Sequence, residues 1–130
     1  MIDWAALKLA ATAVAQNAYA PYSKFRVGAA AFTTDGRLIT GCNVENVSYG
    51  LGLCAECALV SALHSTGGGR LAAVAVVSGT GEPCTPCGRC RQLLVEHGGI
   101  DCLIDCDGSI KTIGDILPDA FTPERLNQDL

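Results

Sequence analysis

Apolar residues recur at two different spacings along the chain, and each change of spacing falls at turn residues. From Trp4 to about Ala18 they follow the period of a helix, and Asp3 stands before them as a helix cap. From Leu71 to Ser78 the apolar run is continuous, which is typical of a strand covered on both faces. The chain is therefore expected to alternate helices with buried strands.

The same patterns predict the other elements. These are strands at Arg26–Thr33 and Leu38–Val44, helices at about Ala55–Ser65 and Cys87–His97, strands at Asp101–Cys106 and Ile110–Ile113, and a short helix after Pro118. Asp35-Gly36 joins the first two strands as a hairpin, and residues 46–53 are expected to form an irregular loop. Gly28 interrupts a strand, which predicts close approach of a ligand or a helix. The order indicates one α/β domain over residues 1–130, with a five-stranded mixed sheet between helices in three α-β-α layers.

Composition narrows the possible partners. Hydrophobic residues make up 49% of the chain and charged residues 17%, with a mean hydropathy of +0.31, so we expect a homo-oligomer. A net charge of −4 and a pI near 4.9 oppose binding to nucleic acid. No apolar run is long enough to span a membrane. A small uncharged ligand is the better match.

Eight cysteines in a short chain suggest either disulfides or metal binding. Ala18-Tyr19-Ala20 imitates a signal-peptide cleavage site, but Asp3 stands where positive charge is usual and Lys8 interrupts the apolar run. We therefore expect a cytoplasmic, reducing environment. There the thiols are expected to bind metal or fill the core rather than pair.

Two segments combine three thiols with one carboxyl group. Cys54 precedes Glu56 by two residues, and Cys87 and Cys90 lie three residues apart within Pro-Cys-Gly-Arg-Cys-Arg-Gln. Three thiolates can hold zinc and leave its fourth position open to water, unlike a closed structural site. Cys54 and Cys87 are predicted at helix N-termini, which favour the thiolate. Glu56 would then carry protons beside the water.

Other interpretations of the cysteines remain open. Cys54 and Cys57 with Cys87 and Cys90 also match a four-cysteine structural zinc site, although the gap between the pairs is longer than usual. Cys84 begins a spacing that resembles an iron–sulfur motif but lacks its last cysteine. The remaining cysteines are expected to be buried core residues: Cys42, Cys102 and Cys106. His64 and His97 lie on predicted helices without a partner at ligand spacing, so each is expected to have a surface or core role.

These motifs together resemble the small, homotetrameric, zinc-dependent cytidine deaminases. Cys-Ala-Glu and Pro-Cys-Gly-x-Cys-Arg-Gln match the signature of zinc deaminases. Residues 25–30, Phe-Arg-Val-Gly-Ala-Ala, and residues 43–46, Asn-Val-Glu-Asn, are similar to two further family motifs. The resemblance extends over nearly the whole chain, and it implies a cytidine deaminase-like fold.

The resemblance also implies a function and roles for individual residues. The reaction would be hydrolysis of cytidine and 2′-deoxycytidine to uridine and 2′-deoxyuridine with release of ammonia, in pyrimidine salvage. Cys54, Cys87 and Cys90 would hold one Zn²⁺ per subunit, and Glu56 would move the protons. The substrate-binding set would be Phe25, Val27, Asn43, Glu45 and Ala55, with Tyr49 and Phe121 as aromatic candidates for sites shared between subunits. For Asn43 and Glu45, loop capping is the alternative role.

One position departs from the family pattern. Many relatives have arginine after the catalytic glutamate, whereas this chain has Cys57. Three thiolates on Zn²⁺ leave one negative charge, so compensation is useful. We expect helix N–H groups and Arg91 to supply it, and Cys57 to be a packing residue.

Two other functions stay open, namely deamination of another nucleoside such as blasticidin S and a non-catalytic zinc-binding interaction module.

Overall fold

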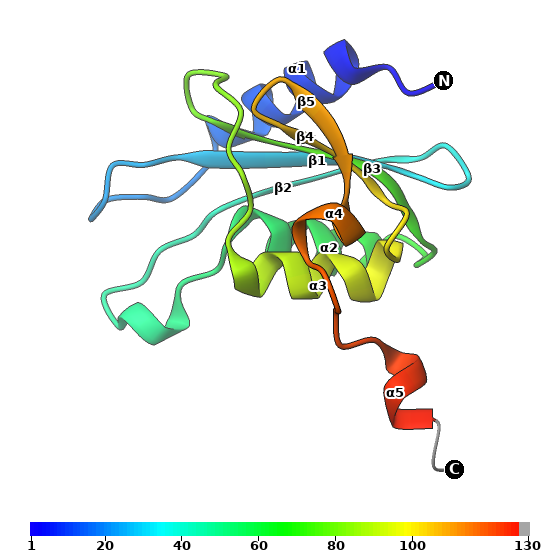
Figure 1. Ribbon diagram of the computed structural model, residues 1–130. Coiled ribbons are helices and arrows are strands. Elements are labelled where there is room, and N and C mark those ends of the chain that lie inside the picture. The colour runs from blue at the N-terminus through cyan, green and yellow to red at the C-terminus, as the bar shows by residue number, and fades with distance from the viewer. Residues whose placement is uncertain (128–130) are drawn as a thin grey trace.

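The fold is built on one five-stranded sheet, seen in a computed structural model that describes residues 1–127 (Figure 1). The strands are β1 (Val27–Thr33), β2 (Leu38–Cys42), β3 (Leu71–Ser78), β4 (Leu103–Cys106) and β5 (Ser109–Thr112). Their order is β2-β1-β3-β4-β5, with only β3 and β4 running parallel to each other. The predicted five-stranded mixed sheet is confirmed.

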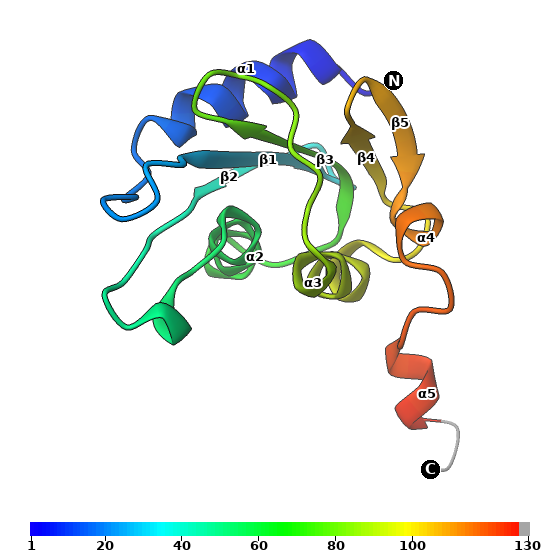
Figure 2. The ribbon, with the colours of Figure 1, turned by 60° about the vertical axis from the view of Figure 1, so that its left-hand side comes forward.

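Helices cover both faces of this sheet, as expected for three layers (Figure 2). The helix α1 (Trp4–Ala15) packs on one face, while α2 (Ala55–Ser65) and α3 (Gly88–Gly98) lie on the other. Asp3 caps α1, because its carboxylate accepts the N–H of Ala6 at 3.0 Å. Separate apolar clusters fill the two interfaces of the sheet.

Two glycines let the helices approach the sheet closely. A Cβ on Gly28 would lie 1.9 Å from the Ala11 carbonyl oxygen of α1, and one on Gly41 would lie 2.4 Å from the Leu59 nitrogen of α2. Close helix packing therefore explains the glycine in the first strand, one of the two expected reasons for it. Gly41 on β2 likewise sets the position of α2, which carries the predicted site residues Ala55 and Glu56.

Several predicted boundaries differ from the structure. The first helix ends at Ala15 rather than near Ala18, and β2 ends at Cys42 because Val44 forms only isolated bridges to Tyr19 and Leu53. Part of the predicted loop is a 3-10 helix, η1 (Tyr49–Leu51). These differences all lie in the segments that join α1 and β2 to the site.

The C-terminal part contains two short helices. Ile113, predicted as a strand residue, begins α4 (Ile113–Ile116). Thr112 and Asp115 form a reciprocal capping box at its start, a signal visible in the sequence. The helix α5 (Pro123–Asn127) realises the short helix expected after Pro118, and it extends away from the body of the domain (Figures 1 and 2). The rest of that expectation falls on residues 128–130, outside the described part of the chain.

Candidate metal centre and adjoining cavities

The N-terminal ends of α2 and α3 meet at three thiols. Cys54 is the N-cap of α2 and Cys87 is the N-cap of α3, and Cys90 lies in the first turn of α3. Their Sγ atoms all lie within 4.8 Å of one another. Tetrahedral zinc with bonds of about 2.3 Å needs sulfur atoms about 3.8 Å apart, so small rotations of these side chains would complete a three-thiolate set.

The other nearby cysteines do not join this group. Cys57 faces a groove between α2 and α3 that is also lined by Arg89 and Gln92. Cys84 lines the cavity beside the thiols, yet it lies outside the group whose Sγ atoms converge among residues 1–127. Within the described chain, the donor set is therefore three thiols, which matches an open zinc site better than a closed four-cysteine one.

The thiols differ in their electrostatic environments. The backbone N–H groups of Cys90 and Arg89 hold the pKa of Cys87 below its ordinary value. Burial raises the pKa of Cys54 and of Cys90, and the charge of Glu56 adds to this rise. A bound cation would stabilise the thiolate forms of these cysteines, because a metal ion deprotonates the thiols that bind it.

Glu56 lies in the first turn of α2 with 5% of its surface exposed. Burial raises the pKa of its carboxyl group above the ordinary range, although its own backbone N–H and the Cys90 thiol counteract this. The side chain borders the same cavity as the three thiols. A carboxyl group that is buried and protonates more readily than usual suits a proton carrier.

A cavity of about 180 Å³ lies over the thiols. Phe25 and Val27 line it from the start of β1, and Ala55 lines it from the first turn of α2. Asn43 and Cys54 also line it, so the structure brings these residues together with the metal centre. The other lining residues are Val76, Cys84, Thr85 and Pro86, of which Val76 and Thr85 belong to none of the motifs.

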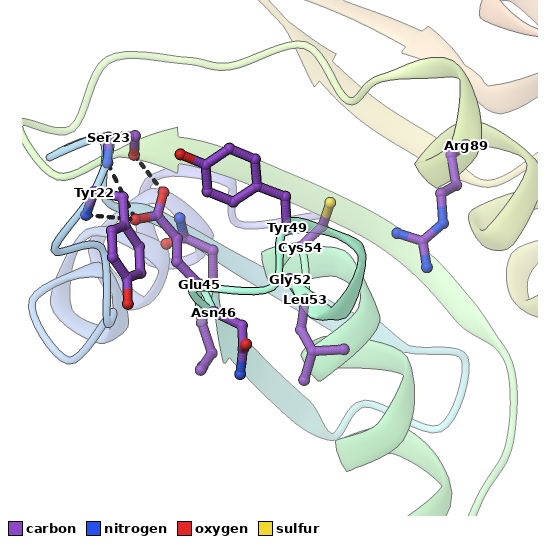
Figure 3. Close-up of a pocket in the computed structure, with 11 residues that line it drawn as sticks. Tyr22, Ser23, Glu45, Asn46, Tyr49, Gly52, Leu53, Cys54 and Arg89 are labelled. Atoms are coloured by element: carbon purple, nitrogen blue, oxygen red, sulfur yellow. Dashed lines mark hydrogen bonds between the residues drawn. The ribbon is translucent and has the colours of Figure 1, made fainter.

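A larger cavity of about 570 Å³ adjoins the first, because Asn43 and Cys54 border both (Figure 3). Glu45 and Arg89 lie on opposite sides of it, with Cys54 between them. Tyr49 reaches it from η1 and is 84% exposed. Two lining residues not anticipated from the sequence, Tyr22 and Ser23, come from the turn before β1.

The side chains of Asn43 and Glu45 also organise the surrounding loops. Asn43 Oδ1 accepts the N–H of Val27 at 2.8 Å, and its Nδ2 donates to the Phe25 carbonyl at 3.0 Å. Glu45 Oε1 accepts the backbone N–H groups of Tyr22 and Ser23, and the Ser23 hydroxyl donates to Oε2 (Figure 3). The loop-capping role considered for this pair is thus seen directly.

Phe121 does not reach either cavity within this single chain. It is exposed, and its carbonyl accepts the Gln92 side-chain N–H at 2.7 Å. Its predicted role requires contact with another subunit, so it stays a prediction.

The Arg91 side chain donates hydrogen bonds to two backbone carbonyl groups. Its Nε donates to the Pro86 carbonyl and one terminal nitrogen donates to the Ile116 carbonyl, both at 2.8 Å. Compensation of the thiolates by Arg91 therefore stays a prediction. Arg89 also borders the cavities of both Cys54 and Cys57.

The remaining cysteines only partly follow the expected core role. Cys102 and Cys106 are buried, and burial raises the pKa of Cys102 to about 12. Cys42 is only partly buried, because it lies at the end of the edge strand β2.

Among residues 1–127, no helix is long and apolar enough to cross a membrane.

Comparison with known proteins gives consistent matches. Residues 3–104 match the family model described as the cytidine and deoxycytidylate deaminase zinc-binding region. A cytidine deaminase from Mycobacterium tuberculosis is 63% identical over 128 residues, which cover 98% of this chain and 96% of the relative. A cytidine deaminase from Halalkalibacterium halodurans is 43% identical over 117 residues, covering 86% of this chain and 89% of the relative.

Solved structures agree with the sequence matches. The crystal structure of cytidine deaminase from Mycobacterium tuberculosis superposes with a TM-score of 0.91 at 63% identity, covering 93% of this chain and 98% of that one. That of cytidine deaminase from Burkholderia pseudomallei gives a TM-score of 0.83 at 44% identity, covering 93% of this chain and all of the other, 100%.

Proposed function

This chain belongs to the cytidine and deoxycytidylate deaminase family, and from that membership we propose that it is a zinc-dependent hydrolase of cytidine and 2′-deoxycytidine. The reaction adds water at C4 of the base and breaks the C4–N4 bond, giving uridine or 2′-deoxyuridine and ammonia. The observation that carries the proposal is the meeting of three thiols and a buried Glu56 at one small cavity.

Zinc is the metal that best matches this donor set. Three thiolates at two helix N-termini favour a thiophilic divalent cation, and the protein ligands leave one position for solvent. When bound, one zinc ion per subunit supplies Lewis-acid activation of a water molecule. The chain's own residues supply the rest.

Glu56 moves the protons in the proposed mechanism. Its carboxylate takes a proton from the attacking water, delivers it to ring N3, and later assists departure of the amino group as ammonia. Burial raises the pKa of this carboxyl group, so the Glu56 carboxylate is a stronger base towards the attacking water than an exposed glutamate.

The two cavities suit the two halves of a nucleoside. We assign the smaller one, between Phe25, Val27 and the backbone of Ala55, to the base. The larger one takes the sugar, with Asn43 and Glu45 as its polar partners. Loop capping and sugar binding are compatible at Glu45, because a carboxylate has about four acceptor positions and only three are occupied by Tyr22 and Ser23.

Charge compensation of the centre is assigned to helix N–H groups and Arg89. The side chain of Arg89 borders the cavity of Cys54 and the groove of Cys57. Arg89 therefore places a positive charge beside Cys57, while Cys57 itself packs between α2 and α3. Three thiolates with Zn²⁺ carry one negative charge, which a neighbouring guanidinium offsets.

A homotetramer with shared active sites is the proposed assembly. Tyr49, which lines the larger cavity, is 84% exposed, and Val47 in the same loop is 76% exposed. Phe121 and Leu126 are exposed on the extended C-terminal arm. Covering these surfaces would place Tyr49 and Phe121 at subunit boundaries. A cytoplasmic place in pyrimidine salvage, and a single deaminase-like domain over residues 1–130, complete the proposal.

The test is a comparison of Glu56→Gln with the wild-type protein. Glutamine keeps the shape of the side chain but cannot take a proton, so zinc content should stay at one per subunit while cytidine turnover falls by about 10²- to 10⁴-fold. Zinc is measured by emission spectrometry and uridine by chromatography. Unchanged turnover would contradict the mechanism.

Cys57→Ala is the matched control for the metal centre. If Cys57 only packs, this variant keeps both its zinc and its turnover. Loss of zinc from Cys57→Ala would instead identify a four-cysteine structural site, and with it a non-catalytic protein. A comparison of rates on cytidine and blasticidin S tests the choice of substrate.

A further inference from the structure

The two histidines of the chain meet at the ends of α2 and α3 that are remote from the thiols. His64 lies in the last turn of α2 and His97 in the last turn of α3. His64 Nε2 and His97 Nδ1 are 3.1 Å apart, and the rings pack edge to face at a centroid distance of 4.9 Å. The surface or core role expected for each histidine did not include this contact.

This pair is distinct from the candidate catalytic centre. The thiols join α2 and α3 at their N-terminal ends, whereas the histidines join the same helices at their C-terminal ends, so the helices run parallel. Ten residues separate Cys54 from His64, which corresponds to about 15 Å along a helix. No step of the proposed reaction uses either histidine.

The surroundings of the pair favour a cation. Both helices direct the negative ends of their macrodipoles towards this point. Glu96 precedes His97 and contributes a negative charge, while Arg70 opposes it from beside the same helix end, donating to the Glu96 carbonyl at 2.9 Å. His64 is exposed and His97 is partly buried, so an ion from solvent has access.

We propose that His64 and His97 form a second metal site, which takes a divalent transition metal such as Ni²⁺, Cu²⁺ or Zn²⁺. Imidazole nitrogen is a preferred ligand of these ions. Two metal–nitrogen bonds of about 2.05 Å that span 3.1 Å enclose an angle of roughly 98°. That angle lies between the values for square-planar and tetrahedral coordination, so both nitrogens can bind one ion once the rings rotate to turn their facing nitrogens towards it.

The proton balance of this site is simple. In the neutral pair one ring donates its N–H to the other across the 3.1 Å contact. Binding requires His64 with its hydrogen on Nδ1 and His97 with its hydrogen on Nε2, so that both facing nitrogens offer lone pairs. This exchange of tautomers releases no net proton. Water molecules complete the coordination of the ion.

The test uses Ni²⁺, which does not oxidise thiols, with the protein loaded with zinc at its thiol site. Calorimetry at pH 7.5 should detect one Ni²⁺ per chain beyond the zinc already present. His64→Gln and His97→Gln should each weaken this binding about tenfold or more, because one imidazole cannot chelate. Cys57→Ala should leave it unchanged.

Nuclear magnetic resonance of the wild-type protein provides a readout that does not depend on variants. The chain has only 2 histidines, so their imidazole signals can be assigned directly. Ni²⁺ should broaden both sets of signals at substoichiometric concentration. Binding should weaken from pH 7.5 to pH 5.5, because protonated imidazoles repel the ion and Glu96 only partly offsets the charge of Arg70.

Two results would overturn the proposal. One is Ni²⁺ affinity that is the same in both histidine variants as in the wild-type protein. The other is broadening that spares the imidazole signals. Loss of binding in Cys57→Ala with retention in the histidine variants would move the site to the thiols. None of these readouts uses turnover, so they are independent of the proposed deaminase activity.

Discussion

The substitution Gly41→Ala on β2 should impair the candidate metal centre, because the added methyl group would push α2 away from the sheet. The Cβ of Gly41→Ala would lie 2.4 Å from the Leu59 nitrogen, 2.7 Å from the Ala55 carbonyl oxygen and 2.8 Å from the Ala58 carbonyl carbon. All three atoms belong to the backbone of α2, so no side-chain rotation can relieve the contact. To restore even 3.0 Å, the helix must retreat by at least 0.6 Å.

That retreat has two measurable consequences. Overpacking of this kind typically costs about 1–3 kcal/mol of stability. Because α2 carries Cys54 and Glu56, both also move relative to the thiols of α3, and misplacement near 1 Å costs roughly 10² in rate. We therefore expect turnover per folded molecule to fall roughly ten- to hundredfold, together with a weaker affinity for zinc.

Two matched variants separate displacement of the site from loss of stability. Leu7→Ala empties a fully buried position of α1 on the other face of the sheet and should cost about 2–5 kcal/mol without moving α2. Gly50→Ala adds a methyl group where no atom lies within 4 Å. Urea unfolding, zinc affinity by chelator competition, and cytidine turnover per folded molecule distinguish the three. If Gly41→Ala and Leu7→Ala reduce turnover per folded molecule equally, the reasoning fails.

Three further predictions concern charges around the fold. Arg89→Ala should weaken zinc affinity in a chelator competition, whereas the charge-conserving Arg89→Lys should retain most of it; equal losses would exclude a role for the charge. The pKa of His97 is lowered in the folded protein, mainly by burial and then by His64. As the pH falls, the unfolded chain therefore protonates at His97 before the folded protein does. The contribution of neutral His97 to the free energy of unfolding is complete above about pH 6.5 and is lost as the pH falls below it. His97→Gln should flatten this pH dependence of the free energy of unfolding, as measured in urea titrations. Lys8 Nζ lies 3.0 Å from the buried Asp105 carboxylate, so Lys8→Met should destabilise by about 1–3 kcal/mol in urea unfolding, and an unchanged midpoint would show that solvent replaces the pair.

The elements that the sequence predicts best are those whose pattern has a single interpretation. The helix Ala55–Ser65 and the strand Leu71–Ser78 have the predicted bounds, because glycines and turn residues limit them clearly. Ile113 ends the predicted strand Ile110–Ile113, but in the structure it begins α4. The capping pair Thr112 and Asp115 is a local signal that outweighs that pattern.

The three thiols of the candidate site were predictable, and the surroundings of the thiols less so. Motif spacing places Cys54, Cys87 and Cys90 at helix starts, and the structure brings them together. The relation between Arg89 and Cys57 depends on how two parallel helices pack, which no local pattern encodes. The meeting of His64 and His97 has the same origin, because residues 33 positions apart share one helix interface.

Absorbance of cytidine after addition of purified protein tests the central claim most directly. The account predicts a decrease as cytidine becomes uridine, release of one ammonia per uridine, loss of the activity after removal of zinc by a chelator, and recovery when zinc is restored. An unchanged spectrum with zinc-loaded, folded protein would contradict it, as would activity that persists after the zinc has been removed.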